Sequence, residues 1–422
     1  MRKFFEIFVL ELRALVRSRA VAMLVVASAA WMLVFPRMAK GDGTPAGLRE
    51  LVVHFSLGGV FALLVVALLA SATGSVARER VARRLQLTLV RPVRYAVVAL
   101  GKIAAHVVVG AGVLALACAI LAFTVDVSVS CSHVLSPAMP SPREEAKAMY
   151  AAYMADTNTP ALVRSTRKSI VLRLLENRAI DRYQTIRTNR VASWTFPSAA
   201  SYPPDAARAV RLRFAGHLEM RHPVQGVFAI GELGGSVSNM TQAVLTVPLR
   251  KREGAESGPE DRLTFSNLGD SAVMMRPRRD INLLVAADAF GWNLLRAYIA
   301  LVAVLSLVVS LGVLLSSCLG RPVAVFVAFV ALIVGEMSPS VVEQYPDELE
   351  TKLVDRVGLA ISRFAMEVTR PVSGLAPLGA LARDECIEAR EVARLALADL
   401  LAIPVLMSLL ASLAMSRKHD EC

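Results

Sequence analysis

The chain has 422 residues and a formal net charge of +12, and 55% of its residues are hydrophobic. This hydrophobic content excludes an ordinary soluble globular protein. The basic charge does not predict nucleic-acid binding, because the Lys and Arg clusters flank apolar runs and carry no interleaved aromatic side chains.

Residues 1–19 are predicted to form a helix that lies along the membrane surface. At 100° per residue, one side of it collects charged residues and the rest is largely apolar. The charged side has Arg2, Glu6, Arg13 and Arg17, and the apolar part has Phe4, Phe8, Leu12 and Leu15. Glu11 does not fit this pattern. A simple basic tail beside the membrane is the alternative interpretation.

Six membrane spans are predicted, since a hydrocarbon core about 30 Å thick needs roughly 20 apolar helical residues. The stronger three, which contain no Asp, Glu, Lys or Arg, are Phe55 to Ala77, Ile103 to Val125 and Ala297 to Gly320. The weaker three are Ala20 to Pro36, Pro322 to Met337 and Leu395 to Met415. Two of the weaker runs are short, and the last contains Asp399.

A charged segment, residues 78–102, joins the second and third predicted spans. It begins near Glu79, continues through a Leu-rich run, and reaches Pro92 nine residues before Gly101-Lys102. This order and spacing resemble the cytoplasmic connector of the ABC-2 type permeases, the membrane subunits of ABC exporters. An ordinary basic loop is the alternative.

The resemblance implies that residues 83–92 form a coupling helix that contacts a separate ATPase. The implied coupling residues are Glu79, Arg83, Arg84, Leu85, Leu87, Leu89, Pro92, Gly101 and Lys102. Arg83 and Arg84 stand where the family usually has Gly and Thr. The start of the helix and its single contacts are therefore less well defined than the Leu-rich run.

The chain has no G-x-x-x-x-G-K-[ST] phosphate loop, because Gly101-Lys102 is followed by Ile103. We therefore expect it to be no enzyme and to bind no cofactor, with ATP and Mg²⁺ held by the separate ATPase. The other expected partners are a second copy or a paralogue, membrane lipid, and an envelope partner for the external domain.

Lys and Arg residues in the short segments that flank the spans predict, by the positive-inside rule, that both termini and residues 78–102 lie in the cytosol. The resemblance makes the membrane the bacterial cytoplasmic membrane. The fold class is then an α-helical polytopic membrane protein with an inserted extracytoplasmic α+β domain, part helical and part antiparallel sandwich. The expected segments are 1–19 (elbow helix), 20–125 (three spans), 126–289 (external domain), 290–338 (two spans), 339–392 (external loop with interfacial helices) and 393–422 (last span and tail).

Three ionisable residues within or beside spans, His106, Glu336 and Asp399, are candidates for a polar pathway. The alternatives are a packed neutral His and carboxylates near the outer headgroups. His217, Glu219 and His222 would not share one face of a strand, so no metal site is predicted. No catalytic residues are predicted either.

Two cysteines outside the spans, Cys131 and Cys386, could form a disulfide on the oxidising side, although two unpaired thiols are favoured. Glycines in the second and third spans predict close helix packing. They are Gly58, Gly59, Gly74, Gly110 and Gly112.

The predicted function is export of an unidentified lipid, glycan or other amphipathic compound by an ABC permease. The alternative is an envelope scaffold or mechanotransmitter, in which ATP-driven motion of the spans moves the external domain and no substrate is transported. A membrane-embedded hydrolase ranks last, because few ionisable groups lie in the spans.

Overall fold

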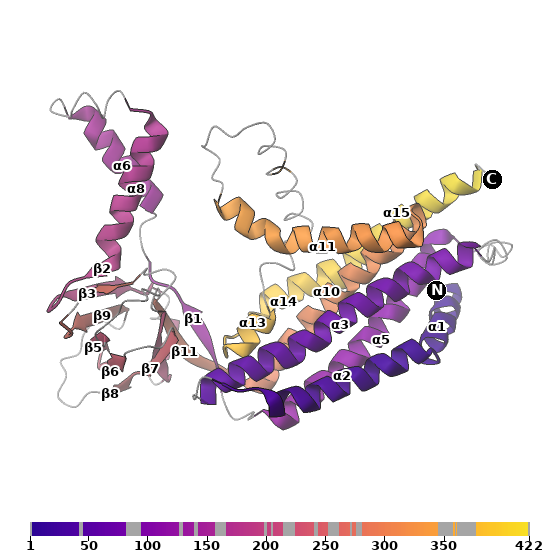
Figure 1. Cartoon of the computed structure of the whole chain (residues 1–422), viewed down its shortest axis with the longest axis horizontal. Coiled ribbons are helices and arrows are strands. Elements are labelled where there is room, and N and C mark those ends of the chain that lie inside the picture. Colours follow the sequence, from indigo (N-terminus) through magenta and orange to yellow (C-terminus); the bar gives the residue numbers. More distant parts are fainter. Residues whose placement is uncertain are drawn as a thin grey trace. The chain divides into compact units, whose positions relative to one another are not determined.

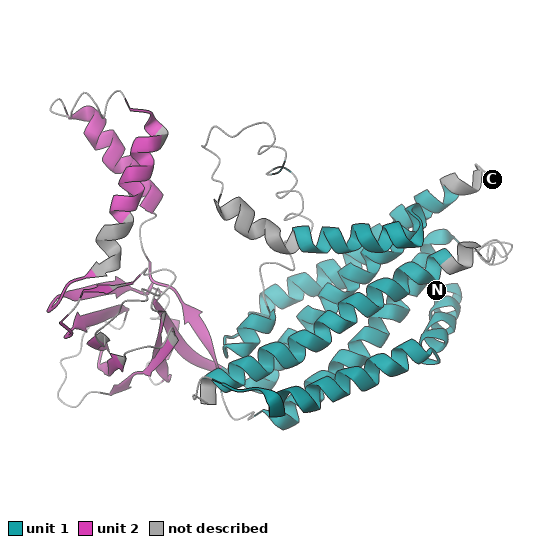
Figure 2. Ribbon diagram, viewed as in Figure 1, with its two compact units in different colours: residues 1–130, 288–422 teal, residues 131–287 magenta. Residues whose placement is uncertain are grey.

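A computed structural model describes most of the chain, divided into two compact units (Figures 1 and 2). Unit 1 comprises Met1–Ser130 and Asp288–Cys422, and unit 2 comprises Cys131–Ala287. The described residues are 2–41, 45–81, 94–125, 130–138, 142–156, 166–197, 201–203, 206–213, 224–239, 244–251, 261–270, 272–275, 281–344, 358, 360 and 377–420.

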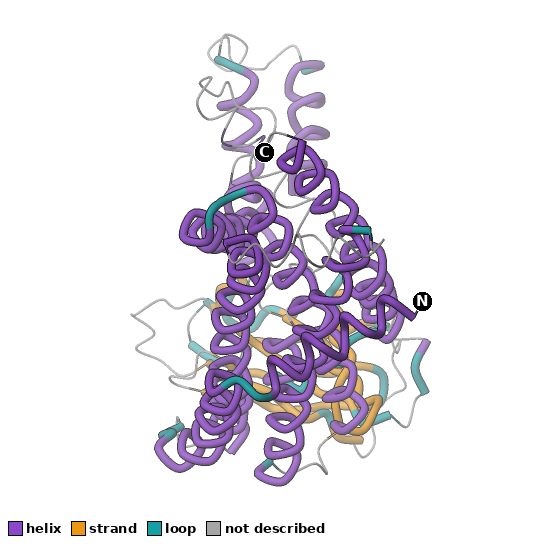
Figure 3. Tube along the Cα trace, turned by 90° about the vertical axis from the view of Figure 1, so that its right-hand side faces the viewer, coloured by secondary structure: helices purple, strands orange, loops and turns teal. Residues whose placement is uncertain are grey.

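Figure 3 distinguishes the helices of the chain from its strands. Nearly all strand residues belong to unit 2, and unit 1 is helical. Its elements are α1 (Arg2–Val16), α2 (Arg19–Met38), α3 (Pro45–Val81), α5 (Tyr95–Thr124), α10 (Phe290–Cys318), α11 (Arg321–Gln344), α13 (Pro377–Ala382), α14 (Ala389–Ala396), the π-helical turn η2 (Leu397–Ala402) and α15 (Ile403–Asp420). Ser18 caps α2, because its Oγ accepts a hydrogen bond from the Val21 amide at 3.2 Å.

Five helical regions of the described chain are long and apolar enough to cross a membrane. They are Arg19–Met38, Gly47–Ala77, Tyr95–Thr124, Phe290–Cys318 and Ala389–Ser416. The prediction of a mostly helical, membrane-embedded chain is confirmed to this extent. The predicted fifth span lies in α11, whose apolar part, Arg321–Val334, is shorter. The prediction that the chain has six membrane spans stays a prediction.

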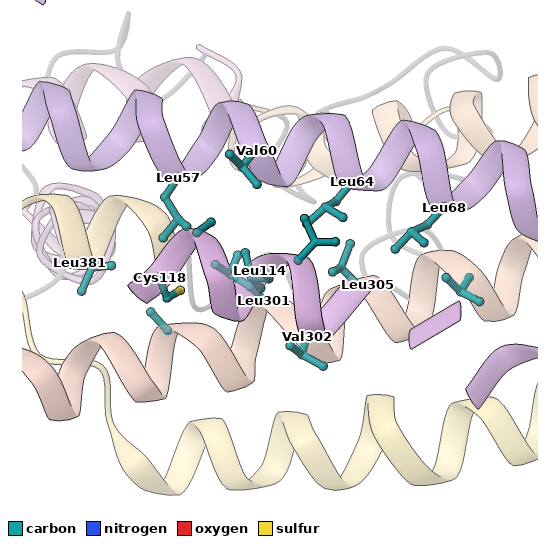
Figure 4. Packing of buried hydrophobic residues seen from close by; sticks show 14 of the residues in the cluster. Leu57, Val60, Leu64, Leu68, Leu114, Cys118, Leu301, Val302, Leu305 and Leu381 are labelled. Atoms are coloured by element: carbon teal, nitrogen blue, oxygen red, sulfur yellow. The ribbon is translucent and has the colours of Figure 1, made fainter. Parts of the chain in front are cut away.

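The core of unit 1 forms where α3, α5 and α10 pack together (Figure 4). Leu57 and Leu64 of α3 lie in one buried cluster with Leu114 of α5 and with Leu301 and Leu305 of α10. These leucines are at most 2% exposed. Side chains at helical spacing on three separate runs of sequence therefore build one continuous apolar contact.

Two of the predicted close approaches at glycine are confirmed. A Cβ on Gly59 would lie 2.4 Å from the Trp31 side chain of α2, and one on Gly110 would lie 2.6 Å from Leu68 of α3. Gly112, in contrast, has nothing within 4 Å of such a Cβ. Close packing within the protomer thus accounts for some of the glycines and not for all.

Unit 2 contains two helices and most of the strands. The helices are α6 (Pro142–Ala155) and α8 (Lys168–Gln184), and the strands are β1 (Ser130–Leu135), β2 (Thr185–Ile186), β3 (Val191–Thr195), β4 (Arg208–Arg213), β5 (Val224–Ile230), β6 (Leu233–Asn239), β7 (Val244–Pro248), β8 (Arg250–Lys251), β9 (Arg262–Asn267), β10 (Val273–Met274) and β11 (Ile281–Ala289). One sheet has the order β1-β11-β4-β7 and another β3-β9-β5-β6-β8, with β10-β2 as a third.

The two larger sheets share one apolar core. Leu212 of β4 and Leu283 of β11 lie in the same buried cluster as Phe228 of β5 and Phe265 of β9, whose rings stack 4.5 Å apart. Antiparallel pairing joins β11 to β4 and β5 to β9. Alternate side chains of β9, such as Leu263 and Phe265, face this core, as expected where one face of a strand is buried.

Several predictions for the external regions have mixed outcomes. Cys131 is disulfide-bonded, and so is Cys386 in unit 1, so the preference for unpaired thiols was wrong. His217, Glu219 and His222 lie outside the described residues. Most of the predicted external loop, 339–392, also lies outside them, apart from residues 339–344, 358, 360 and 377–392.

Candidate functional site

The candidate site is the place where α1 lies against the start of α5, called the α1–α5 junction below. It consists of Glu11 on α1, Gly101, Lys102 and His106 on α5, and Ser71 on α3. In Figure 1, α1 lies at the end of the bundle where α3 ends and α5 begins. The predicted connector joins α3 to α5, so the junction adjoins the segment in which coupling is predicted.

Gly101 allows the two helices to approach closely. A Cβ at this position would lie 2.9 Å from Ile7 Cγ2 and 3.4 Å from the Phe8 backbone nitrogen. The apolar side of α1 continues the contact, since Leu15 clusters with Ala105 and Val109 of α5. Part of the apolar side of α1 thus packs on α5.

Lys102 forms a buried ion pair with Glu11 across this contact. Lys102 Nζ lies 3.1 Å from Glu11 Oε2, and the two side chains are 3% and 11% exposed. A lone buried charge is costly, whereas a paired and hydrogen-bonded one is tolerated. The pair therefore fixes the register in which α1 lies on α5, and it explains why Glu11 departs from the charged side of α1.

His106 extends the junction from α5 to α3. Its ring is fully buried, with Nδ1 2.9 Å from the Lys102 carbonyl oxygen and Nε2 3.2 Å from Ser71 Oγ. A carbonyl only accepts, so Nδ1 donates to Lys102, and in the neutral ring Nε2 accepts from the Ser71 hydroxyl. The Nδ1 bond lies within α5 and fixes the orientation of the ring, and the Nε2 bond to Ser71 joins α5 to α3.

The remaining predicted coupling residues are not placed by the structure. Arg83, Arg84, Leu85, Leu87, Leu89 and Pro92 lie outside the described residues. Glu79 belongs to α3 by its backbone, and its side chain is not described. In the described part of the predicted coupling set, Gly101 packs against Ile7, and Lys102 pairs with Glu11, which the sequence did not single out as a partner.

The predicted polar-pathway residues lie on different helices. His106 belongs to the α1–α5 junction, and Asp399 is buried on η2. Glu336 is part of α11, and its side chain is not described. His106 and Asp399 each lie inside a helix long and apolar enough to cross a membrane. In the described part of the chain, no group of acidic, His and Cys side chains could hold a metal ion.

A second polar contact ties the start of α10 to the segment before α14, and sequence reasoning missed it. Asn293 Nδ2 donates to the Glu385 carbonyl at 2.8 Å, and Asn293 Oδ1 accepts from the Ile387 amide at 2.9 Å. Arg296 Nη1 donates to the Ile387 carbonyl and pairs with Asp288 at 2.7 Å. The guanidinium of Arg296 is therefore bonded within the protein.

Replacing Gly101 with Leu is expected to separate α1 from α5. The new side chain would meet Ile7 and the α1 backbone, which cannot yield as a flexible side chain can. Overpacking of this kind costs about 1–3 kcal/mol. Thermal unfolding of the purified protein would measure the loss, and Gly112→Leu, where the space is open, is the matched control. Equal effects of the two substitutions would contradict a close approach at Gly101.

No family model, curated protein or solved structure matches the chain.

Proposed function

We propose that the chain is the permease subunit of an ABC exporter, driven by a separate ATPase that contacts the connector at residues 78–102. The substrate is an amphipathic compound, such as a lipid or glycan, that leaves the cytoplasm. A second copy or a paralogue completes the membrane part. The α1–α5 junction is the observation that best supports this proposal.

The junction supports the proposal because it joins the parts through which an external force would enter. A separate ATPase reaches a membrane subunit only through cytosolic surface, which here means α1 and the connector. Lys102 lies at the end of the connector and is bonded to Glu11 of α1. His106 of α5 is hydrogen-bonded to Ser71 of α3 and so connects these two helices. Force on either part would thus move α1, α3 and α5 together.

The cysteines support the proposed orientation. Disulfides persist in oxidising compartments and are rare in the cytosol. Cys131 and Cys386 are disulfide-bonded, while Cys118 and Cys318, inside or at the end of spans, form no disulfide. This pattern agrees with an external position for residues 131 and 386 and a cytosolic position for the α1–α5 junction.

Coupling is tested by purifying the chain together with a protein that contains a phosphate loop and is encoded beside it. Leu87→Asp is expected to abolish the stimulation of ATP hydrolysis by the permease, because a charge would replace an apolar contact. Leu174→Asp, at an exposed position of α8 in unit 2, is the matched control and should leave stimulation unchanged. Intact co-purification and intact stimulation in Leu87→Asp would overturn the proposal.

A scaffold or mechanotransmitter remains the second candidate because of one observation. The strand β11, which begins in unit 2, ends at Ala289, and α10 begins at Phe290 with no linker between them. Motion of α10 would thus pass directly into unit 2. Vesicles that contain the complex and a labelled lipid separate the candidates, since ATP-dependent movement of the lipid is expected only of an exporter.

A further inference from the structure

The last span contains a widened helical turn, η2, whose cause is Pro404. The Ile403 amide bonds to the Ala398 carbonyl, five residues earlier, as in a π-helix. Proline has no N–H to donate, and in an α-helix its ring would clash with the carbonyl four residues earlier, that of Leu400. The wider turn relieves this clash. Such turns are frequent at functional sites.

Asp399 lies within this turn and is completely buried. Its exposure is 0%, and neither carboxyl oxygen has a hydrogen-bond partner in the part of the chain that the structure describes. Leu397 and Leu401, on either side of it in sequence, are 65% and 61% exposed. The carboxyl group therefore points into the helix packing, while its neighbours face outward.

The surroundings of Asp399 are apolar. η2 packs against α10, α14 and α15, and Ala300 and Ala303 of α10 form a buried cluster with Leu395, against which Leu400 packs. Described residues 403–416 of α15 contain no ionisable side chain. The side chains of Arg417, Lys418, His419 and Asp420 are not described.

The described charged groups of α14 and α10 do not bond the Asp399 carboxyl group. Arg390, Glu391 and Arg394 of α14 are exposed. Arg296 of α10 is bonded to Asp288 and to the Ile387 carbonyl. The other ionisable groups of α10 are Tyr298, which donates to the Ala111 carbonyl, and Cys318, at the helix end. None of these described groups forms a bond to the Asp399 carboxyl.

We propose that Asp399 is a proton-binding site inside the last span, neutral in this conformation. An ionised carboxylate without a partner in an apolar environment is so costly that the group takes up a proton instead. The proton is released only when η2 moves away from α10 and water reaches the carboxyl group. The proton is thus a ligand of the last span. This inference does not depend on the ATPase proposed above.

Labelling with dicyclohexylcarbodiimide tests the site in the intact protein, since this apolar reagent modifies protonated carboxyl groups within membranes. Mass spectrometry of the digested protein is expected to find the label on Asp399 at neutral pH and less of it at alkaline pH. A water-soluble carbodiimide should leave Asp399 unmodified. Asp288, which is ion-paired with Arg296, is the matched carboxyl and should not take the apolar reagent.

Two further results complete the test. Asp399→Asn, which replaces a neutral acid with a neutral amide of the same shape, should lose the label and keep the native unfolding temperature. The proposal is overturned if Asp399 stays unlabelled, or if sodium at constant pH blocks the label, since the site would then bind a metal cation. A large fall in the unfolding temperature of Asp399→Asn would show an ionised, paired carboxylate and would also overturn it.

Discussion

Replacing Lys102 with Met is expected to lower the free energy of unfolding by about 3–5 kcal/mol, because it leaves the Glu11 carboxylate buried without its partner. Glu11→Leu should cost a similar amount, since it strands the Lys102 ammonium, which is 3% exposed. Both losses would be measured as a lower unfolding temperature of the purified protein in detergent.

The double variant Glu11→Leu/Lys102→Met distinguishes charge from packing. Replacing a whole buried ion pair with apolar side chains is often neutral or stabilising, so the double variant should be more stable than either single variant. Arg2→Met is the matched control, because it breaks an exposed ion pair with Glu6 at a similar distance, 3.2 Å. Its expected cost is about 0–1 kcal/mol. Strictly additive losses in the double variant would contradict a stabilising pair at the junction.

The helices of unit 1 could be predicted from sequence because charge-free apolar runs leave few alternatives in a membrane. Their ends were less predictable. The second predicted span begins at Phe55, whereas α3 begins at Pro45, because polar residues such as Arg49 and Glu50 extend the helix beyond its apolar part. Arg49 finds a partner in Asp384 at 3.1 Å, far away in sequence.

The contacts of the candidate site could be predicted only in part. Gly101 and Lys102 were singled out by their distance from Pro92. Their partner Glu11, however, is 91 residues from Lys102 in the chain. Periodicity describes one helix at a time, so it shows that Glu11 is out of place and does not show what it meets. Pro404 likewise indicates an irregular helix, but it does not by itself predict that the Ile403 amide bonds five residues back, to the Ala398 carbonyl.

Replacing Asn293 with Leu is expected to release the segment before α14 from α10. The amide of Asn293 is fully buried and bonds both the Glu385 carbonyl and the Ile387 amide. Leu would leave these two backbone groups without that partner, at a cost of about 1–3 kcal/mol for each group that stays buried. Trp292→Leu is the matched control, because Trp292 is the adjacent residue of α10 and is 64% exposed.

Hydrogen exchange gives a local measurement of this change. The Ile387 amide donates to Asn293 Oδ1 in the native protein, so its exchange should be faster in Asn293→Leu and unchanged in Trp292→Leu. The effect should be confined to the segment around Cys386 and the start of α14, because the apolar contacts of α3, α5 and α10 do not involve Asn293. Native exchange at Ile387 in Asn293→Leu would show that other contacts, such as the bond from Arg296, suffice to hold the segment in place.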